Sequence, residues 1–335
     1  MPLENGLIHF PGIEGGEWIQ GKITNSDCSG LVTLVDFWDY TCLNCLRALP
    51  YLREWHERYA HLGLLVVGVH TPEFDFAREK KNVLAAVHAY DIPYAVTLDN
   101  ARKIWDSFAN RVWPAKYLFD AEGRLRYSHL GEGDYPGFEE AIQVLLQKRN
   151  DGGEFSGVMA PVRDSDRPGE VGRRGTPELY LGTDRSRIGN REQASGEGSE
   201  WIFPMPSQFL PDTVYLVGKW STQPQFSRFV GEEEGHVLLQ YSAAEVNLVM
   251  RSRFGSRLYI LQDARPLPAE FAGEDVRYEA GHAIVDVREP RLYQLIRSAE
   301  FGSHLLSFST ADRGLQIYAL TFVSRTAPPD EKQTD

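Results

Sequence analysis

The sequence predicts two domains of different class, an α/β domain followed by an all-β sandwich. Its 335 residues exceed what one typical hydrophobic core organises, so two domains are expected. Strand-like and helix-like segments alternate up to residue 150, which is typical of an α/β domain. Beyond residue 176 short strand-length runs are separated by turns, which is typical of an antiparallel sandwich. We therefore place the α/β domain at 1–150, a linker at 151–175, the sandwich at 176–325 and a disordered tail at 326–335.

The α/β domain follows a leader, residues 1–30, that is turn-rich and irregular. Short apolar runs rich in β-branched residues predict buried strands, and apolar residues repeating every three or four positions predict helices. A turn sequence, DAEG, separates two strand-like runs and predicts a hairpin. In chain order we expect a strand at 31–38, a helix from Cys42, a strand at 62–71, a helix at 78–91, a strand at 94–100, one or two helical turns at 101–108, the hairpin at 113–131 and a helix at 138–148.

The two halves are separated by a segment rich in glycine, proline and charge, which is the composition of a linker. A similar stretch, 183–200, predicts a mobile loop. Strand-length segments follow it, and no helix-period segment of ten residues stands out among them. In chain order they are TVYLVGKW, HVLLQYSA, EVNLVMRS, RLYILQDA, HAIVDVRE, RLYQLIRS, HLLSFSTA and LQIYALTFV.

Composition and charge argue against several classes of function. The chain has 47 acidic and 35 basic residues, a net charge of −12, whereas nucleic acids and anionic membranes need a positive footprint. No apolar run approaches the roughly 18 residues of a membrane-spanning helix. The N-terminal residues MPLENGLIHFPGIEGG lack the basic and apolar regions of a signal peptide, so we expect the chain as given in the cytoplasm. An exported or membrane-tethered protein without its targeting part is the alternative.

Two of the three cysteines stand three residues apart in FWDYTCLNCLRALP, residues 37–50. Three interpretations of Cys42 and Cys45 are open: a structural zinc site, an inert buried pair and a redox pair. A zinc site needs four ligands, usually two pairs of the C-x2-C type. Cys28 and the scattered histidines supply no second pair, so we expect no metal. An inert pair is the plainer alternative, because cysteine is commonly buried.

The redox interpretation has a physical basis in the elements around the pair. A predicted strand runs into Cys42 and a helix begins there, and a helix N-terminus stabilises a thiolate through its partial positive charge and free N–H groups. Cys45 lies one turn further along the same side of the helix, within disulfide reach. Cys42 can then attack a substrate disulfide, and Cys45 can resolve the mixed disulfide. Pro50 adds support, since a proline inside a helix costs about 3 kcal/mol unless a kink is accommodated.

The order of strand, C-x-x-C and helix, with the helix proline, resembles the thioredoxin superfamily. The resemblance implies a central mixed sheet flanked by helices. Asp36, six residues before the first cysteine, matches the buried acid that moves a proton to and from the second cysteine. Pro114 matches the cis-proline beside the disulfide, and Trp113 before it offers its backbone to a substrate strand. Trp38 matches the aromatic residue beside the site, with core packing as its plain alternative.

Longer segments narrow the resemblance. Residues 70–100 resemble the insertion of TlpA-like thioredoxins, which adds a helix and a strand. The segments FWDYTCLNCLRALPYL, HTPEF, WPAKYLFDAEGRLRY and GEGDY resemble the DipZ-like branch, in which a thioredoxin-like domain precedes a carbohydrate-binding-module-like jelly roll. TPELYLG, EVNLV and EPRLYQLIR resemble that second domain. DipZ-like domains usually follow a membrane electron carrier and face outside the cytoplasm, which supports the alternative location.

The resemblance implies a thiol–disulfide oxidoreductase. Its partners would be protein disulfide or dithiol substrates and an unidentified electron donor, and it would need no cofactor beyond its own redox-active disulfide. Leu43 and Asn44 stand between the cysteines in place of the Gly-Pro of thioredoxin itself, where the family tunes its potential. With Trp38 and Trp113 they are our predicted substrate-binding residues. Such pairs span about −270 to −120 mV, so the motif leaves the direction of the reaction open.

Two other functions stay open. A thiol peroxidase of the related fold would use a P-x-x-x-T/S-x-x-C loop, but residues 35–42, VDFWDYTC, contain no proline. A binding module is the main alternative, in which the β domain holds a glycan or a partner protein and the α/β domain is its scaffold. Four aromatic residues could form a platform for sugar stacking, although such aromatics are more often core in a β-sandwich. They are Trp201, Tyr215, Trp220 and Tyr241.

Two acids close to the cysteine pair each have a plain and a functional interpretation. Asp36 is unfavourable in a plain strand. Buried and unpaired it would have a raised pKa and exchange protons near neutrality, whereas at a strand end it would be solvated. Asp39 would raise the pKa of Cys42 if its charge lay near the thiol, but a solvated loop acid is the simpler expectation. Cys28, in the leader, is expected to be a spare thiol.

Overall fold

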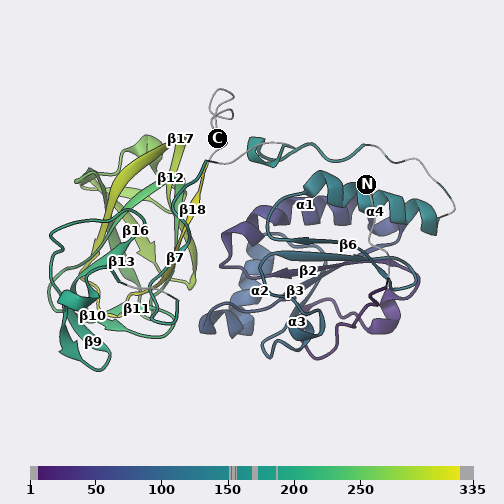
Figure 1. The fold of residues 1–335 in the computed structure, drawn as a ribbon, viewed down its shortest axis with the longest axis horizontal. Coiled ribbons are helices and arrows are strands. Elements are labelled where there is room, and N and C mark those ends of the chain that lie inside the picture. The colour runs from purple at the N-terminus through teal and green to yellow at the C-terminus, as the bar shows by residue number, and fades with distance from the viewer. Residues whose placement is uncertain are drawn as a thin grey trace. The chain divides into compact units, whose positions relative to one another are not determined.

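The structure is a computed structural model, and it describes residues 7–150, 152, 155, 157–167, 173–185 and 188–324. The chain divides into two compact units, Met1–Glu170 and Val171–Asp335. Figure 1 shows a unit of sheet and helices, followed by a unit made of strands. The tail predicted to be disordered, 326–335, lies outside the described residues.

The described residues of the N-terminal unit form a six-stranded mixed sheet in the order β1-β4-β3-β2-β5-β6. β2, β3 and β4 run parallel, and β1, β5 and β6 run antiparallel to their neighbours. All seven residues of β2 are buried, because it is a central strand with both faces covered. The strands are β1 (Glu17–Gln20), β2 (Val32–Trp38), β3 (Leu64–His70), β4 (Ala95–Leu98), β5 (Ala115–Phe119) and β6 (Leu125–Leu130).

Helices cover this sheet, with α1 and α4 along one face and α3 on the other (Figure 1). Trp55 of α1 stacks on Phe138 of α4, with ring centroids 5.4 Å apart and planes 11° from parallel. α1 continues through Pro50 as one helix. The helices are α1 (Leu43–Tyr59), α2 (Lys80–Ala89), α3 (Lys103–Ser107) and α4 (Tyr135–Arg149). The predicted α/β domain is therefore confirmed, with its mixed sheet and flanking helices.

The leader was wrongly predicted to be irregular throughout. β1 lies within it and pairs antiparallel with β4, Glu17 opposite Leu98. An edge strand needs only backbone pairing on one side, so its four residues, EWIQ, carry little of the apolar pattern that marks a central strand. No helix among the described residues is both long and apolar enough to cross a membrane.

The described residues of the C-terminal unit form a twelve-stranded sheet in which neighbouring strands are antiparallel. Its main path is β15-β16-β13-β17-β12-β18-β11-β10-β9-β8, with β14 beside β13 and β7 beside β18. The strands are β7 (Leu179–Tyr180), β8 (Ser195–Glu197), β9 (Glu200–Phe203), β10 (Val214–Thr222), β11 (Ser227–Phe229), β12 (Gly235–Arg251), β13 (Ser256–Gln262), β14 (Arg265–Pro266), β15 (Arg277–Glu279), β16 (His282–Val287), β17 (Arg291–Thr310) and β18 (Gln316–Val323). The all-β class is confirmed, and the narrower jelly-roll interpretation stays a prediction.

Two long strands replace four of the short strands predicted here. HVLLQYSA and EVNLVMRS both fall in β12, and RLYQLIRS and HLLSFSTA both fall in β17. The β12–β17 ladder shifts register between Ala243 and Glu245 and again between Val246 and Asn247. Such bulges bend a strand without ending it, so a break in the alternating pattern was mistaken for a turn.

The stretch 183–200 was also predicted wrongly, as a mobile loop. Its described residues include a 3-10 turn at Arg191–Gln193 and the strand β8, which pairs with β9. Glycine and charge dominate its composition because β8 is an exposed edge strand that buries little.

Candidate functional site

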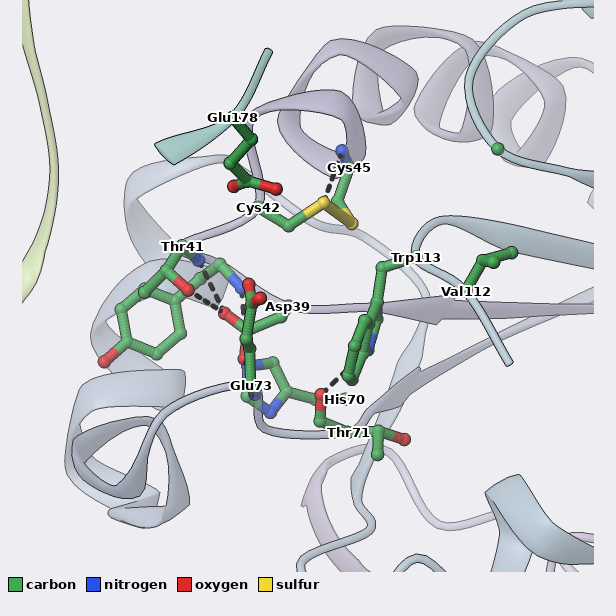
Figure 2. The surroundings of a disulfide bond; sticks show 12 residues. Asp39, Thr41, Cys42, Cys45, His70, Thr71, Glu73, Val112, Trp113 and Glu178 are labelled. Atoms are coloured by element: carbon green, nitrogen blue, oxygen red, sulfur yellow. Dashed lines mark hydrogen bonds and ion pairs between the residues drawn. A yellow bond between two sulfur atoms is a disulfide. The ribbon is translucent and has the colours of Figure 1, made fainter. Parts of the chain in front are cut away.

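A disulfide between Cys42 and Cys45 lies at the start of α1 (Figure 2). β2 ends at Trp38, and a short loop leads to Cys42, which caps the helix. The backbone N–H of Cys45 donates to Cys42 Sγ at 3.2 Å, so the helix N-terminus presents a donor to this sulfur. Cys42 is partly exposed, whereas Cys45 is 1% exposed. A large substrate can therefore reach Cys42 and not Cys45.

The Trp113–Pro114 peptide bond is cis and leads directly into β5. Figure 2 shows Trp113 beside the disulfide, with its indole directed toward Thr71. The indole Nε1 donates to the Thr71 carbonyl oxygen at 3.0 Å, and the ring packs against Trp105 with centroids 4.4 Å apart. These contacts fix the segment next to the disulfide. That its backbone receives a substrate strand stays a prediction.

Asp36 and Lys116 form a buried pair across two strands. They are opposite one another in the antiparallel ladder of β2 and β5, and they are 1% and 0% exposed. Burial raises the pKa of Asp36 to about 7, against the opposing effect of the Lys116 ammonium. Asp36 Oδ1 has no hydrogen-bond partner within the described part of the chain. This carboxyl group can therefore gain and lose a proton near neutral pH.

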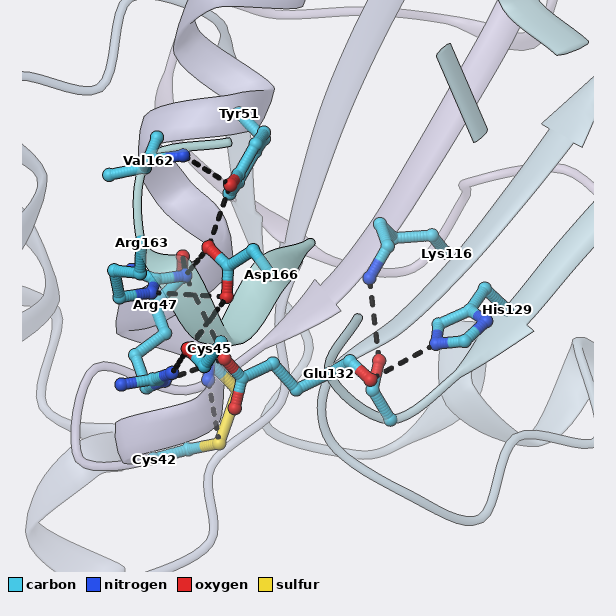
Figure 3. A network of polar contacts seen from close by, with 12 residues as sticks. Cys42, Cys45, Arg47, Tyr51, Lys116, His129, Glu132, Val162, Arg163 and Asp166 are labelled. Atoms are coloured by element: carbon cyan, nitrogen blue, oxygen red, sulfur yellow. Dashed lines mark hydrogen bonds and ion pairs between the residues drawn. A yellow bond between two sulfur atoms is a disulfide. The ribbon is translucent and has the colours of Figure 1, made fainter. Parts of the chain in front are cut away.

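Lys116 is a site residue that sequence analysis missed. Its Nζ donates to the Gly131 carbonyl oxygen at 3.4 Å (Figure 3) and lies 5.6 Å from the centroid of the Tyr135 ring. Burial lowers the pKa of Lys116, while Asp36 raises it. The available signal was a lysine inside the strand-like run AKYLF, two residues after Pro114.

Asp39 is fully buried, so the expectation of a solvated loop acid is wrong. Its Oδ1 accepts the backbone N–H and the hydroxyl of Thr41, both at 2.6 Å, and its Oδ2 accepts the N–H of Glu73 at 2.8 Å. Burial raises the pKa of Asp39, and the bonds from Thr41 and Glu73 oppose that rise. The three donors offset the free-energy cost of burying a carboxylate. No local pattern in the sequence indicates these donors.

His70, the last residue of β3, packs against the same turn. Its Nε2 accepts the Tyr40 N–H at 3.4 Å and lies 3.8 Å from Asp39 Oδ2. The ring stacks on Tyr40 and meets the Trp38 ring edge-on. Burial lowers the pKa of His70 to about 3, so the imidazole is neutral at physiological pH. In the sequence, this histidine stands out only as one of the scattered histidines that could be zinc ligands.

Known protein families match both units. Residues 9–128 match the AhpC/TSA family, and residues 176–322 match the family described as Thioredoxin like C-terminal domain. The unit that carries the disulfide is therefore thioredoxin-like, and the second match covers most of the β unit.

Curated relatives include Protein DipZ of Mycobacterium bovis and of Mycobacterium tuberculosis, each 31% identical over 295 residues. The matched region is 88% of this chain but 39% of DipZ, so the chain spans about two fifths of the length of that relative. The thiol-disulfide oxidoreductase YkuV of Bacillus subtilis is 28% identical over 130 residues, 38% of this chain and 87% of YkuV. A solved thiol-disulfide isomerase from Corynebacterium glutamicum is 21% identical, with a TM-score of 0.38, over 43% of this chain and 98% of that one.

The predicted substrate-binding residues of the thioredoxin-like unit fall into two groups. Asn44 is exposed, and Leu43 and Trp113 are partly exposed, so a substrate can reach all three. Trp38 is 0% exposed, so the expectation that it contacts substrate is not met. It ends a central strand and packs against His70, which agrees with the core-packing alternative.

The predicted linker, 151–175, is in part packed on the thioredoxin-like unit. Its residues 157–167, which we call the strap, contact α1 (Figure 3) and also α4. The Tyr51 hydroxyl accepts the Val162 N–H and donates to Asp166 Oδ2, both at 2.7 Å. The N–H of Met159 donates to Oε2 of Glu139, a carboxylate that is 1% exposed. These contacts are polar, so a segment poor in apolar residues can make them, and its composition gave no indication of packing.

Charged side chains extend this network toward the disulfide. Arg47, on α1, donates from Nε to Glu132 Oε1 at 2.6 Å. Arg163 of the strap donates to the Arg47 carbonyl oxygen at 2.7 Å and pairs with Asp166 at 2.9 Å. The Asp166 side chain is 4% exposed and that of Arg47 is 14% exposed, so this is a largely buried ionic network. Figure 3 shows it next to Cys45.

The proposed aromatic platform of the β unit does not form. Trp220, Tyr215 and Tyr241 are buried in the core. Trp201 is partly buried, and the Arg191 guanidinium lies over its ring, 3.3 Å from the centroid. These four residues therefore agree with the core-packing alternative. Among the described residues, no group of three or more His, Cys, Asp or Glu side chains could hold a metal ion.

Proposed function

We propose that this chain is a thiol–disulfide oxidoreductase, with Cys42 as the attacking thiolate and Cys45 as the resolving thiol. One observation carries the proposal. The disulfide lies at a helix N-terminus with one sulfur accessible and the other buried, and the accessible sulfur accepts the N–H of Cys45. Such a position favours the thiolate over the thiol. The similarity to YkuV, named a thiol-disulfide oxidoreductase, supports the same chemistry.

The proposed reaction has two exchange steps. The Cys42 thiolate attacks one sulfur of a protein disulfide, forms a mixed disulfide, and releases the other substrate sulfur as a thiolate. Cys45 then loses its proton and attacks Cys42 Sγ, which restores the Cys42–Cys45 disulfide and releases the second substrate thiol. The substrate gains two electrons and two protons, and a dithiol donor reduces the enzyme again.

Asp36 is the proposed proton acceptor for Cys45, through a water molecule. Its pKa of about 7 suits proton exchange at neutral pH. Lys116 holds that pKa below the value that burial alone would give. For the β unit we propose a docking or ligand-binding role, because the match to DipZ runs through both units.

Insulin reduction by dithiothreitol tests the proposed activity. Wild type should accelerate precipitation of the insulin chains, and Cys42→Ser should abolish the acceleration. Cys28→Ser is the matched control, because Cys28 is buried and burial raises its pKa to about 11, so its loss should leave the rate unchanged. A wild-type rate equal to that of Cys42→Ser would contradict the proposal.

A further inference from the structure

A buried carboxylate, that of Asp39, lies three residues before Cys42, and the reaction described so far gives it no role. Asp39 Oδ1 is bound by the N–H and the hydroxyl of Thr41, the residue covalently joined to Cys42. The N–H of Cys42 donates to the Asp39 carbonyl oxygen at 3.2 Å, which closes the turn. Figure 2 shows Asp39 between this turn and His70. The side chain is therefore fixed close to Cys42 by its own backbone and by its neighbour.

The contacts of Asp39 are those of an ionised group. The bonds from Thr41 and Glu73 bring three donors to its two oxygens, and an ionised carboxylate is an acceptor only. His70, the titratable group that faces it, uses Nε2 to accept the Tyr40 N–H. That nitrogen therefore carries no proton that could pair with Asp39 Oδ2, which lies 3.8 Å away.

Residues 71 and 73, which follow β3, also hold the turn before Cys42 in place. The N–H of Glu73 binds Asp39 Oδ2, and the N–H of Thr71 donates to the Trp38 carbonyl oxygen at 3.1 Å. The carbonyl oxygen of Thr71 accepts the indole N–H of Trp113 at 3.0 Å. Residues 70–73 thus join the turn before Cys42 to the cis-proline segment. The carboxylate cannot swing into water without breaking this arrangement.

We propose that Asp39 is a positioning residue whose fixed negative charge makes the Cys42–Cys45 pair a reductant. The N-terminus of α1 stabilises the Cys42 thiolate, and a negative charge nearby opposes that stabilisation. The reduced form carries the thiolate and the disulfide carries no charge, so the charge of Asp39 destabilises the reduced form only. A pair with a destabilised reduced form gives up its electrons more readily. The inference rests on the proposed function and adds the direction of the exchange reaction, in which the enzyme reduces protein disulfides.

Equilibration of the full chain with glutathione buffers at neutral pH tests this inference. Asp39→Asn keeps the shape of the side chain and removes its charge. We expect the equilibrium constant for reduction of the protein disulfide by glutathione to rise about tenfold, which is about 30 mV. Ultraviolet absorbance of the thiolate should show Cys42 ionising at lower pH than in wild type.

Asp120→Asn is the matched control. Asp120 is also buried in a turn and accepts the N–H groups of Glu122 and Arg124. Pro114 directly precedes β5 and Asp120 directly follows it, so Asp120 lies at the far end of that strand. Its replacement should leave the glutathione equilibrium unchanged. Asp39→Ser is a second neutral variant, since a serine hydroxyl can accept the Thr41 N–H in the same kind of turn, and it should shift the equilibrium in the same direction as Asp39→Asn.

The inference is overturned if the folded neutral variants at position 39 match the control, or if they shift the equilibrium toward the disulfide. This measurement needs no turnover, so its outcome is separate from the insulin assay. Loss of the shift with insulin reduction intact would remove the role of Asp39 alone. An intact shift with no insulin reduction would contradict the proposed activity alone.

Discussion

Two buried aspartates at the redox site, three residues apart, are held in opposite ways. Asp36, in the central strand, faces Lys116 and has an oxygen without a hydrogen-bond partner among the described residues. Asp39, in the turn, receives three hydrogen bonds from Thr41 and Glu73. Equal burial therefore produces a group that can change its protonation and a group held as a fixed charge. What distinguishes the two aspartates is the number of hydrogen bonds that each carboxyl group accepts, and not its distance from Cys42 in the sequence.

The largest expected effect concerns stability, and it separates Asp36 from Asp39. The pKa of Asp36 rises from 3.8 to about 7 on folding, so between these values the folded chain binds one more proton than the unfolded chain. The free energy of unfolding should therefore fall as pH rises through this window, by about 4 kcal/mol in total. Urea unfolding followed by tryptophan fluorescence across this window measures the slope.

Asp36→Asn should remove this part of the pH dependence, because asparagine does not titrate. Cys28→Ser is the control for the loss of a buried group elsewhere in the unit, and it should keep the wild-type slope. Identical slopes for wild type and Asp36→Asn would show that Asp36 does not carry the extra proton.

The second effect is on rate. With its proton acceptor removed, Asp36→Asn should reduce insulin about 10²-fold more slowly than wild type, at the lower end of what general acid–base groups contribute. The wild-type rate should rise with pH through about 7 as Asp36 ionises. Asp39→Asn should keep this rise in the pH profile, because Asp39 is already ionised. A pH profile of Asp36→Asn that retains the rise would assign the proton to another group.

The third effect refines the description of Asp36. Lys116→Met should remove the charge that lowers its pKa, so the rise in rate should move to higher pH. At pH 7 we expect a loss of up to about tenfold, equivalent to a pKa change of one unit. Lys148→Met, an exposed position on α4, is the control and should leave the profile in place. An unchanged profile in Lys116→Met would separate the lysine from Asp36.

Apart from β1, the sequence predicted the main strands and helices of this unit, and it predicted the cysteine pair, but it did not predict the partners of its acids. The strand at 31–38 and the helix from Cys42 follow from apolar periodicity, which is local. The burial of Lys116 depends on its register opposite Asp36, and strand register is a property of the whole sheet. The burial of Asp39 depends on the N–H of Glu73, more than thirty residues away. Such pairings leave no local pattern.

The smallest expected effect concerns a third buried acid, Asp166 of the strap, which like Asp39 is held by hydrogen bonds from its neighbours. Asp166→Asn should lower the free energy of unfolding by about 1 kcal/mol, because it weakens the bonds to Tyr51 and Arg163. The rate of insulin reduction should not change. Asp164→Asn is the matched control: Asp164 and its partner Arg167 are both largely exposed, so its loss should change stability by less than about 0.5 kcal/mol. Equal effects would show that the strap contacts do not stabilise the unit.

The strap and the β unit show a different limit of sequence analysis. Composition correctly marked residues 151–175 as poor in apolar side chains, but the strap is held by polar contacts with Tyr51 and Glu139. In the β unit the alternating pattern located the strands, yet bulges joined four predicted strands into β12 and β17. A bulge shifts the alternation by one residue, which in sequence looks the same as the end of a strand.

The strap decides how much of this protein can be transplanted. A redox module cut after Asn150 would contain every strand and every α-helix that the structure describes in the thioredoxin-like unit, but not the short 3-10 helix Asp164–Asp166 of the strap. It would lack the Met159 N–H that binds Glu139 and the Asp166 carboxylate that accepts from Tyr51. Each buried polar group left without its partner costs about 1–3 kcal/mol. The portable module therefore runs to Arg167. A chain that is cut or fused directly after α4 would lose the hydrogen bonds that Tyr51 of α1 and Glu139 of α4 make with the strap, and it should be less stable.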